Sequence, residues 1–268
     1  MAVTVLKIGG ALRDDALQAV VRAVHAARRA GDDVAVVHGG GPRITAALAE
    51  AGIELPFVDG LRLTTPEAVT VVERVLAREV NGELVAQLCA AGLPACGLSG
   101  ADGILWARGL PGMQRTGEVA RVEVQPVRAA WSAGHVPVLA PVGVDEHGRR
   151  YNVNADLAAA AVAGRLGARR VVFLTDVPGI YEDFAAKRLL TDVRAERLRA
   201  LRSAGCFTAG MIPKVEAVLA AIDAGVKQVY VVDGRDEAAV TWAATDAGEA
   251  EPRPGAFPGT RVTKEEVA

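Results

Sequence analysis

Val34-Ala35-Val36-Val37-His38-Gly39-Gly40-Gly41-Pro42 is the segment around which this sequence is organised. Four residues typical of a strand run directly into three glycines, and helical sequence resumes from about Arg43. Glycines allow a ligand to approach the backbone and favour positive φ angles, which expose consecutive N–H groups, and the following helix N-terminus adds more. The segment predicts a phosphate-binding turn. Because neither G-x-G-x-x-G nor G-x-x-x-x-G-K-[ST] occurs, a dinucleotide turn and a purely structural turn stay open.

The flanking sequence extends this turn into an α/β pattern. Ala2–Ile8 predicts a buried strand that ends at Gly9-Gly10, and Ala16–Arg29 has apolar residues at helical spacing. With Val34–Val37 they form a β-α-β unit. Strands and helices alternate along the rest of the chain, which predicts an α/β sandwich with a mainly parallel sheet. Ligands of such sheets bind beyond the carboxyl ends of the strands, where the glycine turns open.

The middle of the chain predicts one long helix and one boundary. The helix covers residues 68–91 and starts at Thr65-Pro66, with the threonine as N-cap. The stretch 143–153 is irregular and is the best boundary between two lobes, residues 1–150 and 151–268.

The composition excludes several classes of protein. The 268 residues carry a formal net charge of −2, so no basic field would recruit nucleic acid. No signal peptide is predicted, and the most apolar stretch, Ala155–Gly164, is too short to span a membrane. Cys89, Cys96 and Cys206 lack metal-binding spacing and suit reduced core residues. We expect a cytoplasmic protein with neither nucleic acid nor a membrane as partner.

Two lysines stand at unusual positions. Lys7 lies in an apolar strand directly before a glycine turn, and burying an unpaired ammonium is costly. Lys214 follows Pro213 in the first turn of a predicted helix, where the helix dipole disfavours a cation. A bound anion would explain both lysines. A strand end that reaches solvent and an ordinary surface lysine are the alternatives.

Three further stretches offer polar groups. Asn154 can cap a predicted helix and Asp156 suits its first turn, but neither role explains Asn152. Arg62, in an otherwise apolar segment, can clamp a carboxylate with its guanidinium or form a structural ion pair. Thr175–Tyr181 is a polar turn after a buried strand, suited to a ribose or a base edge, although it is also an ordinary loop.

The four histidines show neither metal-ligand nor catalytic-triad spacing, and no G-x-S-x-G motif is present. A zinc site and a hydrolase nucleophile are therefore unsupported, and we predict no metal held by the protein's own side chains.

Six sequence motifs, taken together and in their order, resemble a known family, although each motif alone is not specific. They are K-I-G-G, V-V-H-G-G-G-P, D-G-L-R-L-T, N-V-N-A-D, L-T-D-V-P-G-I and G-M-I-P-K-V, and they span almost the whole chain. The set resembles the amino acid kinase family, most closely its members that phosphorylate N-acetyl-L-glutamate in the second step of arginine biosynthesis. The resemblance implies a three-layer αβα sandwich, with acceptor binding and dimerisation in the first lobe and ATP binding in the second.

The resemblance also implies a role for each matching residue. The two transition-state lysines and the carboxylate that orients them correspond to Lys7, Lys214 and Asp156. Backbone donors around the transferred phosphoryl group and the acceptor correspond to Gly9, Gly10, Gly40 and Gly41. The residues that hold the acetylamino acid correspond to Arg62 and Asn152. The nucleotide-binding residues correspond to Asp176, Val177, Pro178, Gly179, Ile180, Tyr181, Cys206, Phe207 and Thr208.

The implied chemistry agrees with the residue types. A carboxylate acceptor is ionised at neutral pH and needs no general base, so a catalytic histidine is not required. The site must position two anions that repel each other and neutralise charge as the phosphoryl group passes between them. The implied cofactor is ATP with Mg²⁺, the ion being held by the nucleotide and mostly by water.

Two alternatives to a kinase of free N-acetyl-L-glutamate stay open. Related kinases phosphorylate an aminoadipate or glutamate on a carrier protein, but they usually replace the third glycine of the first motif, and Gly41 is present here. Residues 113–119 depart from the usual pattern near the acceptor. A non-catalytic nucleotide or arginine sensor is the other alternative, and the intact lysines and Asp156 argue against it. The sequence starts at its first strand, without the extra helix of arginine-inhibited relatives, so we expect a homodimer without that feedback.

Overall fold

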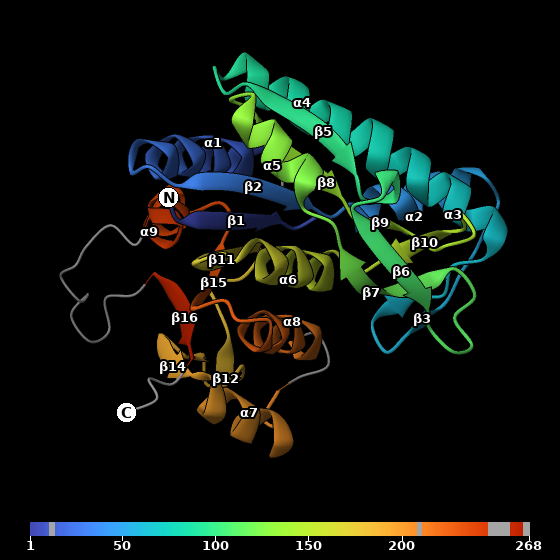
Figure 1. The fold of residues 1–268 in the computed structure, drawn as a ribbon. Coiled ribbons are helices and arrows are strands. Elements are labelled where there is room, and N and C mark those ends of the chain that lie inside the picture. The colour runs from blue at the N-terminus through green and yellow to red at the C-terminus, as the bar shows by residue number, and fades with distance from the viewer. Residues whose placement is uncertain (11–13, 208–210, 246–257, 265–268) are drawn as a thin grey trace.

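The computed structural model describes residues 1–10, 14–207, 211–245 and 258–264, so Thr208 lies outside the described part. An eight-stranded sheet with the order β14-β16-β15-β11-β1-β2-β8-β5 runs through the molecule (Figure 1). Its strands are β1 (Val3–Ile8), β2 (Asp33–His38), β5 (Ala95–Ser99), β8 (Val136–Ala140), β11 (Arg170–Thr175), β14 (Asp192–Arg194), β15 (Gln228–Asp233) and β16 (Gly259–Thr263). Neighbouring strands pair in parallel except β15 and β16, so the predicted mainly parallel sheet is confirmed.

Helices cover both faces of this sheet. One layer contains α1 (Asp14–Arg29), α4 (Asn81–Ala90) and α9 (Glu237–Thr245). The other contains α5 (Gln125–Ser132), α6 (Ala155–Leu166) and α8 (Ile212–Asp223), with α7 (Ala195–Ser203) packed on α8. Side chains alternate along a strand, so Val5 joins the core under α6 and Leu6 the core under α1. The three-layer αβα sandwich is confirmed, and Lys7 shares the α6 face with Val5.

The predicted long helix is interrupted. Thr65 caps α3 (Pro66–Glu73) as predicted, because its Oγ1 accepts from the Ala68 N–H at 3.1 Å. A π-helical segment, η1 (Arg74–Val80), separates α3 from α4. Together with α2 (Gly41–Glu50), α3 and η1 form a third apolar cluster beside the carboxyl edge of the sheet.

A small barrel closes the same side of the molecule. Its strands are β6 (Leu105–Gly109), β7 (Thr116–Val122), β9 (Val142–Val144) and β10 (Arg150–Val153). The expectation that residues 143–153 are irregular is therefore wrong. The stretch is a hairpin whose strands are too short to show an alternating pattern, and Asp145 Oδ1 holds its turn by accepting from the His147 and Arg149 N–H groups at 3.0 and 2.9 Å.

Two hairpins and a 3₁₀ turn complete the described elements. The hairpins are β3–β4 (Phe57–Val58 and Leu61–Arg62) and β12–β13 (Tyr181–Asp183 and Arg188–Leu189), and the turn is η2 (Gly100–Asp102). In the described parts of the chain, no helix has both the length and the apolar character needed to cross a membrane.

Candidate active site

A cavity of ≈ 220 Å³ opens at the carboxyl ends of β1 and β2. Its walls come from the two glycine turns, the β3–β4 hairpin, the barrel and the start of α6. The structure thereby gathers seven of the predicted site residues around one space: Lys7, Gly10, Gly40, Gly41, Arg62, Asn152 and Asp156. They come from segments far apart in the sequence.

Lys7 and Asp156 form an ion pair at the base of this cavity. The Lys7 Nζ lies 2.6 Å from Asp156 Oδ1, and Lys7 is only 8% exposed. Asp156 is fixed by the start of α6, where Asn154 Oδ1 accepts from the Asp156 and Leu157 N–H groups at 2.9 and 3.1 Å. The buried ammonium therefore has a carboxylate partner within the protein, and its remaining N–H groups can donate to a second anion.

The glycine turns are shaped by close packing. The predicted positive φ angles are wrong for Gly39, Gly40 and Gly41, and Gly40 has φ −173° and ψ 21°. A methyl group built on Gly10 would lie 2.6 Å from the Gly40 nitrogen and 2.7 Å from that of Gly41. One on Gly40 would lie 2.6 Å from Leu76 Cδ2. Glycine is required because two turns and a helix meet here.

The start of α2 supplies N–H donors. The Ile44 N–H donates to the Gly40 carbonyl at 2.9 Å, and the N–H groups of Gly41 and Arg43 before it have no carbonyl within the helix to bind. Such a helix start favours an anion. The N–H of Gly9, in contrast, donates to the Leu174 carbonyl at 3.2 Å. The expectation that Gly9 donates to a phosphoryl group through its N–H does not hold in this structure.

Arg62 is held by a hydrogen bond and by stacking on an aromatic ring. Its Nη2 donates to Thr45 Oγ1 at 2.6 Å, and its guanidinium stacks over the Phe57 ring at 4.5 Å from the centroid. Burial lowers the pKa of Arg62, yet an arginine stays charged at neutral pH. Within the described residues no carboxylate lies in ion-pair range of Arg62, so the alternative of a structural ion pair is not formed.

Threonine hydroxyls connect Asn152 to the backbone of Arg62. Asn152 Nδ2 donates to Thr64 Oγ1 at 3.0 Å, and the Thr64 hydroxyl donates to the Arg62 carbonyl at the same distance. The Thr116 hydroxyl donates to that carbonyl at 2.6 Å. Sequence reasoning missed these threonines because their long-range partners are 52 to 88 residues away along the chain.

Lys214 is positioned by α8. It sits in the first turn of α8, half-buried, and it is not among the lining residues. Its neighbour Pro213 lies against the β3–β4 hairpin, since a methyl group on Gly60 would lie 3.3 Å from Pro213 Cγ. In the described part of the chain Asp156 pairs with Lys7 and not with Lys214, so one of the two predicted lysine contacts of Asp156 is formed.

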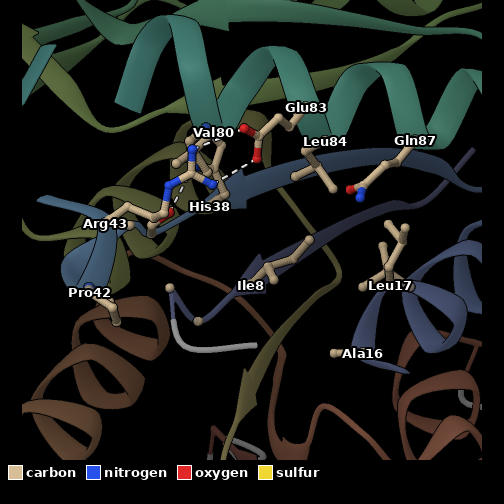
Figure 2. A pocket seen from close by; sticks show the side chains of 15 residues that line it. Ile8, Ala16, Leu17, His38, Pro42, Arg43, Val80, Glu83, Leu84 and Gln87 are labelled. Carbon is tan, nitrogen blue, oxygen red and sulfur yellow. Dashed lines mark hydrogen bonds and ion pairs between the residues drawn. The ribbon is translucent and has the colours of Figure 1, made fainter. Parts of the chain in front are cut away.

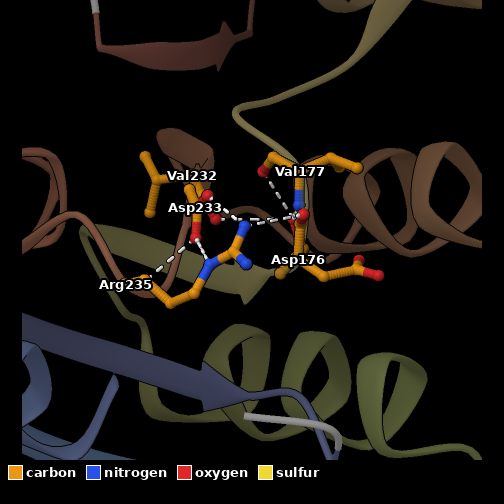
Figure 3. A network of polar contacts seen from close by, with 6 residues as sticks. Asp176, Val177, Val232, Asp233 and Arg235 are labelled. Carbon is orange, nitrogen blue, oxygen red and sulfur yellow. Dashed lines mark hydrogen bonds and ion pairs between the residues drawn. The ribbon is translucent and has the colours of Figure 1, made fainter. Parts of the chain in front are cut away.

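The turn after β11 is held by a clamp that the sequence did not predict. The Arg235 guanidinium donates to the Asp176 carbonyl at 3.2 Å and to both Asp233 oxygens at 2.6 and 2.9 Å (Figure 3). These hydrogen bonds lower the pKa of Asp233. Thr175 Oγ1 accepts from the Val177 N–H at 3.2 Å within the same turn. The carboxyl ends of β11 and β15 are thus locked together.

The other residues implied for the nucleotide differ in exposure. Ile180 is fully buried, and a methyl group on Gly179 would lie 2.5 Å from Thr260 Oγ1, so both positions face β16. Phe207 is buried, whereas Cys206 is exposed and lines a cavity of ≈ 720 Å³ beside the β12–β13 hairpin. Pro178 lies in the turn before β12, and Tyr181 is the first residue of β12. Among the described residues, no three His, Cys, Asp or Glu side chains cluster as metal ligands would.

The sequence pattern of the Amino acid kinase family matches residues 2–233. This chain belongs to the amino acid kinase family. The acetylglutamate kinase of Geobacillus kaustophilus is 42% identical over 86% of the chain and 90% of its own length. That of Granulibacter bethesdensis is 41% identical over 87% and 84%. Both relatives are thus matched along most of their length.

Solved structures share this fold. The N-acetylglutamate synthase of Neisseria gonorrhoeae, solved with coenzyme A and N-acetyl-glutamate, matches 99% of the chain with a TM-score of 0.82 and 22% identity. The chain spans 60% of the length of that synthase. At this identity the match shows the fold alone.

Proposed function

We propose that this protein transfers the γ-phosphoryl group of ATP to the side-chain carboxylate of N-acetyl-L-glutamate, the second step of arginine biosynthesis. The relatives named acetylglutamate kinase support this activity. The observation that carries it is the buried Lys7–Asp156 pair in a cavity with Arg62 and the start of α2 on its other walls. Such a cavity offers positive groups at two places, as a dicarboxylic acceptor and a phosphoryl group together need.

The proposed roles follow from these contacts. Arg62, fixed by Thr45 and Phe57, takes the α-carboxylate of the acceptor as a bidentate partner, and the Asn152 amide takes the acetamido group. Lys7 and the N–H groups of Gly40 and Gly41 stabilise the charge of the phosphoryl group in flight. Lys214 takes part from α8, where its neighbour Pro213 lies close to Gly60.

The nucleotide is proposed to lie against the turn after β11 and the start of α8. The Arg235 clamp gives Asp176–Tyr181 a fixed backbone, which suits recognition of a base edge or ribose. Mg²⁺ is proposed to arrive with the ATP phosphates, where it would neutralise charge on the leaving group. Its other ligands would be water, since the lining residues offer few carboxylates.

Two properties follow from the family resemblance alone. We propose a cytoplasmic homodimer whose first lobe, residues 1–150, binds the acceptor and carries the dimer contact, while residues 151–268 bind ATP. Light scattering on the purified chain checks the mass of the assembly. If the fully active protein is a monomer, the proposed dimer is wrong and the proposed reaction still stands.

A substrate panel tests the function. ADP release is measured with ATP and Mg²⁺ in the presence of N-acetylglutamate, glutamate, aspartate, carbamate or aminoadipate. We expect rapid turnover with N-acetylglutamate and a kcat/KM at least ~100-fold lower for free glutamate, because the α-ammonium of glutamate cannot replace the amide at Asn152. Turnover of none of these acids, with binding of ATP retained, would favour a carrier-linked acceptor or a sensor.

Arg62→Lys tests the acceptor site. Lysine keeps the charge but loses the fork that two carboxylate oxygens bind and the stacking on Phe57. We expect the KM for N-acetylglutamate to rise ~10–100-fold and the KM for ATP to change little. Arg108→Lys, at an exposed pair with Glu118 on the barrel, is the control and should leave both constants unchanged. Equal effects of the two substitutions would remove Arg62 from the acceptor site.

A further inference from the structure

The Gly39–Gly41 turn has a second side. A cavity of ≈ 480 Å³ lies behind it, between α1 and α4, and shares Gly10, Gly39 and Gly40 with the cavity in front (Figure 2). His38 lines only the rear cavity, below Val80 in Figure 2. The turn is therefore a thin partition between the two cavities, and His38 contacts it from the rear.

Both ring nitrogens of His38 are engaged, and their partners fix its tautomer. Nδ1 lies 3.0 Å from the Gly39 carbonyl oxygen, which can only accept, so Nδ1 carries the hydrogen. Nε2 lies 3.1 Å from Asn81 Nδ2, which can only donate, so Nε2 is the acceptor. Asn81 is itself oriented, because its Nδ2 also donates to the Val138 carbonyl at 2.9 Å. Burial lowers the pKa of His38 to about 4, which keeps the ring neutral.

The bond to Gly39 sets the direction of a catalytic N–H. The Gly39 carbonyl and the Gly40 N–H belong to one planar trans peptide and point in opposite directions. When His38 holds the carbonyl toward the rear cavity, the Gly40 N–H is turned toward the front, where the phosphoryl group is proposed to pass. The ring acts on the reaction without touching substrate.

The π-helical segment places the partners of this turn. Leu76 packs against Gly40, and Asn81, five residues later, reaches His38. In an α-helix two residues five apart differ by about 140° around the axis. The i→i+5 turns of η1 bring them to one face, so one segment contacts both ends of the turn. Gly97 on β5 leaves the room that the Asn81 side-chain oxygen occupies, since a methyl group there would collide with it.

We propose that His38, held as its Nδ1–H tautomer by Asn81, is a positioning residue that aims the Gly40 N–H at the transferred phosphoryl group. The proposal rests on the proposed function for what the turn binds. The hydrogen bonds of His38 do not depend on which acceptor the protein binds.

Two substitutions of His38 test its two ring nitrogens separately. Asn carries its amide nitrogen near the place of Nδ1, whereas Gln carries it near Nε2. We expect His38→Asn to keep kcat within ~5-fold of the wild type and His38→Gln to lower kcat ~10–100-fold, with the KM of each substrate changed less than ~3-fold. The control is His25→Gln, because His25 Nε2 also contacts a backbone carbonyl, that of Ala91, far from the turn. A His38→Gln enzyme as active as the control would overturn the proposal.

A spectroscopic measurement needs neither substrate nor turnover. The ¹⁵N shifts of the labelled imidazole rings in the full chain report the tautomer, and His38→Asn assigns the signals of His38. We expect a neutral Nδ1–H ring at pH 7 that converts toward a mixture of tautomers in Asn81→Ala. An Nε2–H ring or an imidazolium in the wild type would refute the arrangement, even if the variants fail to fold. If the tautomer is found and no acid in the substrate panel is phosphorylated, the proposed function fails and this geometry does not.

Discussion

At the scale of single residues, Lys7 and His38 show two ways in which a titratable group can be buried. They lie on neighbouring strands, where Lys7 pairs in register with Val37 and Ile8 with His38. The Lys7 Nζ forms an ion pair with Asp156 Oδ1 at 2.6 Å. His38 is desolvated and lies near the Lys7 charge, and both effects lower its pKa. Lys7 thus offers N–H groups that can bind an anion, whereas His38 holds the Gly39 carbonyl without adding charge.

The lowered pKa of His38 makes stability depend on pH. Its pKa is about 4 in the folded chain and 6.5 when unfolded, so between these values the unfolded chain binds more protons. The contribution of His38 to the free energy of unfolding is fully present above pH 6.5 and is lost as the pH falls toward 4. We expect it to lower the free energy of unfolding by about 2 kcal/mol between pH 7 and pH 5. Urea denaturation at the two values should show a smaller drop for His38→Gln than for His25→Gln, and equal drops would contradict the burial of a neutral ring.

Residue-level prediction from sequence succeeded where a residue conflicted with its local setting. A lysine in an apolar strand and a lone arginine in an apolar segment needed partners, and both line the cavity. His38 raised no such conflict, because its partner Asn81 is 43 residues away and no metal or triad spacing links them. The threonines around Arg62 were missed for the same reason.

At the scale of elements, the two glycine turns act as one unit. A methyl group on Gly10 would meet the backbone nitrogens of Gly40 and Gly41, which cannot move without shifting the turn. We expect Gly10→Ala to lower kcat by ~100-fold. Gly82→Ala is the matched control, since it adds the same methyl group to α4 with nothing within 4 Å and should leave kcat unchanged. A Gly10→Ala enzyme with normal kcat would show that the packing of the two turns does not matter for the reaction.

The clamp between β11 and β15 gives a prediction for the nucleotide. Arg235→Lys removes the fork that joins Asp233 to the Asp176 carbonyl, so the turn proposed to bind ATP loses its support. We expect the Kd for ATP, measured by calorimetry, to rise ~10-fold with the binding of N-acetylglutamate unchanged. Arg22→Lys, at an exposed pair with Glu237 that joins α1 to α9, should leave the affinity for ATP as it is. Equal affinities for ATP in the wild type and Arg235→Lys would place the nucleotide elsewhere.

Elements were predictable in proportion to their length and local signals. The β-α-β start and the capped helices followed from apolar spacing and N-cap residues, and they are present. The π-helical segment was not predictable from the local sequence, and its contacts are with distant residues, Leu76 with Gly40 and the adjoining Asn81 with His38. Strands β9 and β10 are too short for a pattern, and they persist because the barrel pairs them.

At the scale of the whole molecule, the two edges of the sheet have different tasks. The carboxyl edge collects the turns, the hairpin and the barrel around the cavity. Toward the amino edge, Arg170 is buried and donates to Asp32 Oδ2 at 2.8 Å and to the Ala244 carbonyl at 2.9 Å, which joins β11 to the ends of α1 and α9. The fold is thus fixed at one edge while the other presents binding groups from both halves of the chain.

Lys7 and Lys214 are proposed to act together on a phosphoryl group that passes to a carboxylate. The most direct measurement traps the product: ATP, Mg²⁺ and N-acetylglutamate are incubated with hydroxylamine, which converts an acyl phosphate to a hydroxamate. We expect one hydroxamate per ADP for the wild type. Lys7→Ala and Lys214→Ala should each lower kcat at least ~100-fold while calorimetry still detects both ligands. Full turnover in both variants, or ADP release without hydroxamate, would contradict the account.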